Sequence, residues 1–159
     1  MSNRRAKSKG YFLFNLKTQP VAATVLSLSV MKPGLKPGLE QDLIRVVTRD
    51  LCVSQITGLP SVLATAEMIR MMEMAAYLLL QPYYEPSEAS VGTAVNIRHL
   101  KAAPLGVQVR AVAKLTGVDG RRCLFEVAAF DEKEKIGEGT HERLVIDLER
   151  YRARLEAKL

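Results

Sequence analysis

Residues 61–80 read SVLATAEMIRMMEMAAYLLL, and this stretch of twenty residues decides the fold. It contains no glycine or proline and is rich in alanine, methionine, leucine and glutamate, which are good helix formers. We predict one long helix here, capped by Thr57 or Ser61 and ended by Pro82 and Pro86. Its apolar residues recur at spacings of three and four, at Val62, Leu63, Ala66, Ile69, Met72, Ala76, Leu79 and Leu80. Because so much of the circumference is apolar, the helix should be buried against a broad surface.

Extended segments flank this helix. Residues 40–53 are rich in β-branched side chains, which favours a strand. Four further extended segments follow the helix, at residues 89–101, 106–119, 121–132 and 135–148. They alternate apolar and polar positions, as in the series Val91, Thr93, Val95, Ile97 and His99 and the series Val107, Val109, Ala111, Ala113 and Leu115.

The order of these elements indicates the architecture. One strand, a long apolar helix and four consecutive strands, two of them joined by the Asp119-Gly120 hairpin signal, favour an antiparallel sheet that covers the helix. We therefore predict an α+β fold of the hotdog type, in which a curved antiparallel β-sheet wraps one long central helix.

The domain organisation follows from length and local composition. A chain of 159 residues fits one domain, which we place at residues 31–148 after the turn-rich segment 32–38. Residues 1–30 form a basic extension, loosely attached or preceding a start at Met31, with a targeting segment as the other interpretation. Residues 149–159 are a charged tail that forms a short helix.

Charge and composition exclude several classes of function. The net charge of +6 comes from the ends, since residues 1–30 hold five basic residues and no acidic one. With no basic helix or aromatic RNA-binding motif, we expect no nucleic-acid partner. No apolar run is long enough to span a membrane, so we expect no membrane partner. Two distant cysteines, Cys52 and Cys123, fit reduced thiols in a cytoplasmic protein, and no metal-ligand spacing is present.

Two residues of the predicted helix are candidates for chemistry. Glu73 stands in its most apolar part, either as a solvated carboxylate paired with Arg70 or as a partly buried base or nucleophile. Thr65 lies eight residues earlier, about 12 Å along the axis. It is either an ordinary helix residue bonded back to a carbonyl or a group that orients a carbonyl or water near the helix N-terminus.

Further candidates lie on the predicted strands. His99 shares a face with apolar neighbours, as a satisfied core residue or as a general base near neutral pH. Gly92 opens the same strand, either for close packing or to expose an N–H group to a ligand. His141 and Arg143 share one face of the last strand, where Arg143 can pair with an acid or hold an anionic group. Acyl transfer needs groups that hold a carbonyl, attack it and move a proton, and this set offers all three.

Three stretches resemble the fluoroacetyl-CoA thioesterase family of hotdog proteins. They are LATAEMIRMMEMAA (63–76), EPSEASVGTAVNIRHLKAAPLG (85–106) and IGEGTHERLVIDLERYRARL (136–155). The segment MKPGLKPGLE (31–40) resembles the beginning of that family. The similarity runs from about Met31 to Arg154.

The resemblance implies a homodimer that hydrolyses a small acyl-CoA without a metal or bound cofactor. It implies a catalytic threonine at Thr65, a glutamate at Glu73 that attacks the thioester or activates water, and a base at His99. It also places Gly92 and Arg143 beside the acyl group. The phosphates of CoA would meet some of the basic residues Lys101, Arg110, Lys114, Arg121 and Arg122.

One departure concerns the acyl group. The fluoroacetate specialist of the family has a phenylalanine gate before the helix, where this chain has Leu59 and Pro60. Because a hydrophobic pocket discriminates by only a few kcal/mol, another short or aromatic acyl group fits this pattern as well. Two other functions stay open, a non-catalytic acyl-CoA-binding module and a hotdog hydratase or dehydratase of enoyl thioesters.

Overall fold

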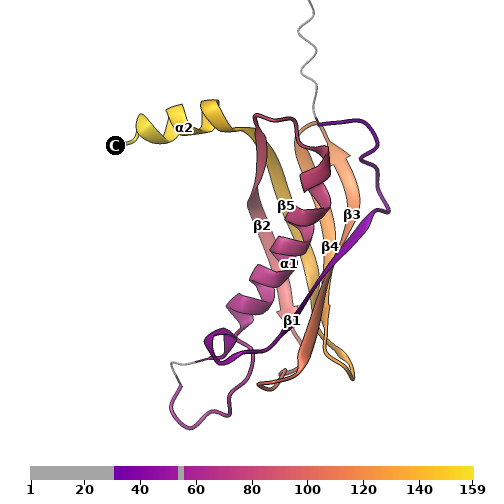
Figure 1. Ribbon diagram of the computed structural model, residues 1–159, viewed down its shortest axis with the longest axis vertical. Coiled ribbons are helices and arrows are strands. Elements are labelled where there is room, and N and C mark those ends of the chain that lie inside the picture. The colour runs from indigo at the N-terminus through magenta and orange to yellow at the C-terminus, as the bar shows by residue number, and fades with distance from the viewer. Residues whose placement is uncertain (1–30, 54–55) are drawn as a thin grey trace, which may run out of the picture.

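The protein, described here by a computed structural model over residues 31–53 and 56–159, contains one five-stranded sheet around one long helix. All neighbouring strands are antiparallel, in the order β1-β3-β4-β5-β2. The strands are β1 (Glu40–Val46), β2 (Glu88–His99), β3 (Gln108–Asp119), β4 (Arg122–Phe130) and β5 (Lys135–Asp147). The helix α1 (Thr65–Leu80) lies across one face of the curved sheet (Figure 1), which confirms the predicted hotdog architecture. The expectation for residues 1–30 lies outside the described residues.

The helix α1 begins later than the sequence predicts. Its N-cap is Ala64, which makes no side-chain cap hydrogen bond, so the predicted caps at Thr57 and Ser61 are wrong. The residues just before the helix are extended instead, because their backbones complete other pairings. The N–H of Leu63 donates to Ala103 O at 2.8 Å, and that of Ala64 donates to Leu51 O at 2.9 Å.

The buried face of α1 carries more methionine than the predicted stripe. The helix residues in the core are Met68, Met71, Met72, Ala75, Ala76, Leu79 and Leu80, whereas Ala66 is exposed and Ile69 only partly buried. A glycine of β5 makes room for this face. A Cβ on Gly137 would lie 2.5 Å from Met68 Sδ and 3.2 Å from Met72 Cε. The bare backbone at Gly137 therefore lets the helix lie close against the sheet.

The inner face of the sheet supplies the other half of the core. Alternate residues of β3 are buried, and they are Val109, Ala111, Ala113 and Leu115 as the sequence predicts. The same alternation buries Phe125, Val127 and Ala129 of β4. Removal of these apolar surfaces from water is the main term that holds helix and sheet together.

A β-bulge in β2 changes which of its residues face the helix. The pairing with β5 shifts between Gly92 and Ala94, so Thr93 has no partner in the register. Gly92 pairs with Arg143 and Val95 pairs with His141, and both partners are buried. Gly92 therefore shares the inner face with Val95 and His99, whereas simple alternation puts Thr93 there. The prediction that His99 shares a face with Val95 and Ile97 is confirmed.

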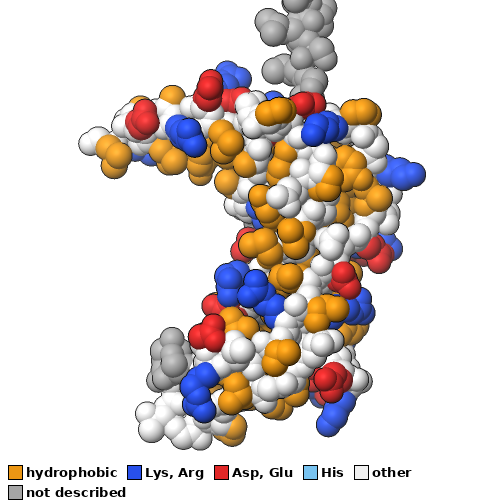
Figure 2. Space-filling model, viewed as in Figure 1, with side chains coloured by type: hydrophobic (Ala, Val, Ile, Leu, Met, Phe, Trp, Pro, Cys, Tyr) orange, Lys and Arg blue, Asp and Glu red, His pale blue; other side chains and the backbone are white. Residues whose placement is uncertain are grey.

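Two features mark the side of the molecule at β2. Among residues 31–53 and 56–159, this strand pairs with β5 alone, so it is an edge of the described sheet. The C-terminal helix α2 (Leu148–Glu156) starts beside it and extends away from the body. Figure 2 shows that the molecule is concave between α2 and the opposite end.

Within the described residues, no helix has the length and apolar character needed to cross a membrane.

Candidate active site

Glu73 of α1 points toward the inner face of β2. A Cβ built on Gly92 would lie 2.6 Å from Glu73 Oε1, so only glycine leaves room for the carboxylate there. The side chain of Glu73 is 36% exposed, which keeps it open to a ligand. The ordinary alternative, a pair between Glu73 and Arg70, is wrong, because Arg70 pairs with Glu67 at 2.6 Å.

Arg143 of β5 is a buried cation held by neutral acceptors. Its Nε donates to Ser90 Oγ at 2.8 Å and its Nη2 to Ser90 O at 2.9 Å. Its Nη1 donates to the backbone carbonyl of Glu73 at 3.3 Å, and the guanidinium lies over the ring of Tyr77 at 5.7 Å. Among the described residues, no carboxylate pairs with Arg143 within salt-bridge distance. The positive charge of Arg143 therefore stays available to the site.

His141 completes this group, although the sequence analysis did not select it as a site residue. The ring is buried, and its Nδ1 lies 2.9 Å from the carbonyl oxygen of Ala94. Its Nε2 lies 3.3 Å from Arg143 Nη1 and 3.8 Å from Glu73 Oε1. Burial, followed by the charge of Arg143, lowers the pKa of His141. The alternation that places His141 and Arg143 on one face was the available signal.

Thr65 and His99 form a second group at the N-terminus of α1. Thr65 Oγ1 lies 2.8 Å from His99 Nδ1, so the hydroxyl bonds to an imidazole rather than back to a helix carbonyl. The Nε2 of His99 is buried and has no hydrogen-bond partner in the described part of the chain. A hydroxyl next to an imidazole is a pair that can move a proton.

The two groups lie apart within one chain. Thr65 and Glu73 are separated by eight helix residues, about 12 Å along the axis. His99 and Gly92 are separated by seven positions of β2, roughly 20 Å. One chain thus brings Glu73 together with Gly92 and Arg143, and Thr65 together with His99, but does not join the two sets.

Leu59, the remaining predicted substrate residue, lies in the segment before α1. Its side chain is exposed, and its N–H donates to Ile56 O at 3.4 Å. Leu59 is not among the residues that line the cavity beside Glu73 and Arg143.

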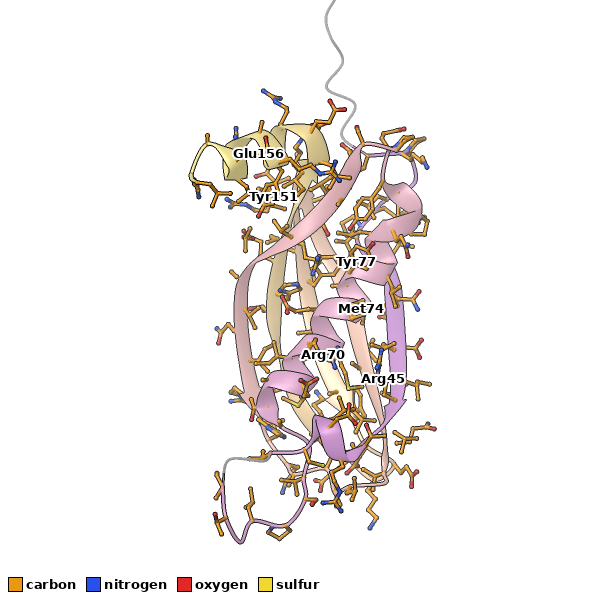
Figure 3. All side chains as sticks on the ribbon, turned by 60° about the vertical axis from the view of Figure 1, so that its left-hand side comes forward. Arg45, Arg70, Met74, Tyr77, Tyr151 and Glu156 are labelled. Carbon is orange, nitrogen blue, oxygen red and sulfur yellow. The ribbon has the colours of Figure 1, made fainter. Side chains whose placement is uncertain are left out.

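A cavity of about 270 Å³ opens at the Glu73 group. It is lined by Arg70, Glu73, Met74, Tyr77, Gly92 and Arg143. Figure 3 shows Arg70, Met74 and Tyr77 following one another along α1. Apolar walls around a carboxylate and a buried cation suit a small acyl group whose carbonyl becomes negatively charged during reaction. Within residues 31–53 and 56–159, no cluster of three or more His, Cys, Asp or Glu side chains is arranged to hold a metal ion.

Comparison with solved structures shows the class of protein to which this fold belongs. The chain matches the structure of the fluoroacetyl-CoA thioesterase FlK with a TM-score of 0.75 and 38% identity, over 79% of this chain and 98% of the other. It also matches a hypothetical protein of Thermus thermophilus described as a thioesterase superfamily member. That match has a TM-score of 0.73 and 29% identity, over 80% of this chain and 97% of the other. The molecule is thus a hotdog-fold thioesterase in its architecture.

Sequence comparison then gives the family. The profile of the fluoroacetyl-CoA-specific thioesterase family FlK matches residues 47–149. The fluoroacetyl-CoA thioesterase of Streptantibioticus cattleyicolor is 44% identical over 99 residues, which are 62% of this chain and 71% of that protein. The chain belongs to the FlK family and is a thioester hydrolase, which confirms the predicted family and enzyme class.

Proposed function

We propose that this protein hydrolyses a small acyl-CoA to the free acid and CoA. The observation that carries the proposal is the Glu73 carboxylate, which faces a cavity of about 270 Å³ beside Gly92 and the buried cation Arg143. Membership of the FlK family and the relative that acts on fluoroacetyl-CoA support it. The reaction needs no metal or bound cofactor, because a carboxylate, a hydroxyl and an imidazole supply attack and proton transfer.

Glu73 either attacks the thioester carbon or activates a water that does so. In the first case the C–S bond breaks as CoA leaves, and water then hydrolyses the resulting anhydride to free acid and regenerated Glu73. Thr65 assists at the carbonyl, and His99 removes the proton from water as general base. Arg143 adds positive potential where negative charge develops on the carbonyl oxygen.

Release of CoA thiol, followed with DTNB across short, halogenated, branched and aromatic acyl-CoAs, tests the activity. Turnover of one subset, reduced by about 1,000-fold or more in Glu73→Gln, is expected if the carboxylate reacts directly. Glu67→Gln is the matched control, because Glu67 lies on the same helix and is not among the residues that line the cavity. Full turnover by Glu73→Gln would exclude the proposed role. Tight acyl-CoA binding without turnover in the wild type would make the chain a binding module instead.

The proposed enzyme is a homodimer joined through β2. This strand is twelve residues long, and no strand of the described part of the chain pairs with its outer edge. The inner-face residue Val95 is 44% exposed beside that edge. Such an edge readily pairs with another strand, and the concave side in Figure 2 leaves space for a second copy. Antiparallel pairing of two copies of β2 about the middle of the strand sets the Gly92 half of one strand beside the His99 half of the other. The second copy thereby brings the Thr65–His99 group to the Glu73 group.

Mixed dimers test this arrangement. Glu73→Gln and His99→Ala subunits, each inactive alone, are co-expressed, and dimers are confirmed by light scattering. With sites shared between subunits, random mixing restores about a quarter of wild-type activity, because half of the dimers hold one intact site. No restoration would place each complete site within one subunit.

We also propose that the protein is located in the cytoplasm. Both of its cysteines are free and buried, which fits a reducing compartment.

A further inference from the structure

His141 is the buried titratable residue that the proposed reaction does not use. Its ring stacks on Phe125 with a centroid distance of 6.2 Å and lies between β2 and Arg143. Because a backbone carbonyl only accepts hydrogen bonds, the contact with Ala94 O requires a proton on Nδ1. In the neutral ring, Nε2 then carries a lone pair and accepts from Arg143 Nη1 at 3.3 Å.

We infer that His141 is a positioning residue, which in its neutral form holds the Arg143 guanidinium in place beside Glu73. The inference rests on the proposed function and assigns a new residue to it. His141 does not touch the cavity as one of its lining residues, so it acts through Arg143 and Glu73.

The Arg143 guanidinium is held by Ser90 on the side away from Glu73 and by His141 on the side toward Glu73. Ser90 accepts from Nε and Nη2, and its hydroxyl is itself 2.6 Å from Tyr84 Oη. This side is therefore fixed by a buried chain of hydrogen bonds. On the Glu73 side, the hydrogen-bond partners of Nη1 among the described residues are the Glu73 carbonyl and His141 Nε2. Loss of the imidazole acceptor leaves Nη1 with the Glu73 carbonyl alone among the described residues, so the guanidinium is held less firmly and can tilt toward the carboxylate.

Protonation of His141 would reverse its effect. Three charged groups surround it: Arg143 on the same strand, Glu73 from α1, and Glu142, which pairs with Arg122 at 3.6 Å. A protonated Nε2 cannot accept from Arg143 and places two cations 3.3 Å apart. It donates instead toward Glu73 Oε1, now 3.8 Å away, and draws the carboxylate from the thioester. Neutral His141 therefore keeps Glu73 free to react.

Two substitutions of His141 in the full chain test the inference. His141→Phe keeps the flat ring on Phe125 and removes both nitrogens, whereas His141→Gln keeps a non-titrating donor and acceptor. We expect His141→Phe to lower kcat by about 10- to 100-fold with little change in KM, since a misplacement of about 1 Å has an effect of that size. His141→Gln should recover most of kcat and extend activity to lower pH than the wild type.

Val127→Ala provides the control for a purely structural effect. Val127 is buried on the inner face of the neighbouring strand β4 and belongs to neither polar group. We expect this variant to lower Tm without changing the pH profile of kcat. The inference is wrong if folded His141→Phe stays within twofold of wild-type kcat, or if His141→Gln is as impaired as His141→Phe. If the decrease of kcat at low pH is identical in the wild type and in His141→Gln, the proposed effect of His141 protonation is refuted.

Nitrogen-15 NMR of the histidine rings separates this inference from the proposed activity. We expect His141 to show a protonated Nδ1 and an unprotonated Nε2 at neutral pH. A proton on Nε2 would overturn the inference whatever the catalytic result. If the wild type cleaves no acyl-CoA, the proposed function fails, while the NMR spectrum still decides the contact between His141 and Arg143.

Discussion

The two histidines of the inner sheet face have opposite surroundings. His99 stands at the end of β2, bonds to the Thr65 hydroxyl and keeps a buried Nε2 without a partner among the described residues. His141 lies in the middle of β5, where a carbonyl and a guanidinium engage both of its nitrogens. A ring with a free nitrogen can take up a proton from a reactant, whereas a ring with both nitrogens engaged fixes its neighbours. The same residue type is thus suited to chemistry at the end of β2 and to support in the middle of β5.

The two groups also differ in how the backbone makes room for them. At the Glu73 group, the bulge in β2 turns Gly92 inward, and the missing Cβ accommodates the carboxylate. At the Thr65 group, no glycine is needed, because the hydroxyl reaches across from the first residue of α1. Substitutions in the Glu73 group and in the Thr65 group should therefore impair activity for different structural reasons.

Among the substitutions that compare the two groups, the largest effect is expected for Gly92→Ala. The new Cβ would lie 2.6 Å from Glu73 Oε1 and 3.1 Å from His141 Cε1, so the carboxylate must move. Because the displaced atoms are at the end of a flexible side chain, we expect kcat to fall about 100-fold while Tm changes little. Steady-state thiol release and thermal unfolding measure the two effects.

Gly117→Ala is the matched control for this substitution. Gly117 lies in β3, where a Cβ would meet Leu124 Cδ1 at 3.4 Å, an ordinary contact. Equal losses of kcat in the two alanine variants would show that Gly92 has no special relation to Glu73.

A smaller effect is expected at the other group. Thr65→Val removes the hydroxyl that meets His99 Nδ1 at 2.8 Å and keeps the shape of the side chain. We expect a loss of about 10-fold in kcat, or about 1.4 kcal/mol, if this hydroxyl assists the reaction. Thr65→Ser keeps the hydroxyl and should retain most activity. Equal rates for the serine and valine variants would assign Thr65 to packing alone.

The smallest effect concerns stability at mildly acidic pH. The pKa of His141 is lowered from 6.5, chiefly by burial, so the unfolded chain takes up this proton first as pH falls. Stability is therefore complete above about pH 6.5 and decreases toward the folded-state pKa, by at most about 1.4 kcal/mol per pH unit from this one proton. Urea unfolding at several pH values should show this slope in the wild type and a flatter one in His141→Gln. An equal slope in both would assign the titration to another group.

The fold was predictable because its signals are local. The apolar run of α1 and the alternation of β3 specify their own burial, and short turns join the neighbouring strands β3, β4 and β5. The pairing of β2 with β5 and of β1 with β3 joins strands that are distant in the sequence, so no local signal indicates it. The start of α1 at Thr65 was not predictable, since Leu63 and Ala64 pair with Ala103 and Leu51 across the fold. These tertiary hydrogen bonds hold residues 63 and 64 in an extended conformation, so the helix does not begin at Ser61 as its local sequence predicts.

The site was predictable as a set of residue types but not as an arrangement. Glu73 stood out because a charge is rare inside so apolar a helix. Its closeness to Gly92 depends on the bulge at Thr93, and alternation alone puts Gly92 on the other face. His141 shared a face with Arg143 in the sequence pattern. Nothing local indicated that its Nε2 would lie between Arg143 and Glu73.

The two sides of α1 have a consequence for evolution and for engineering of acyl preference. Met68 and Met72 face Gly137 across a tightly packed seam, where a change of volume disturbs the whole domain. Met74 and Tyr77 line the cavity from the other side of the same helix and are not part of the buried core face. The size of Met74, which is exposed, can change with little effect on folding stability, whereas Tyr77 also packs against the core and against Arg143. Under the proposed function, a new acyl specificity can therefore arise by a single substitution that keeps both the scaffold and the Glu73 carboxylate.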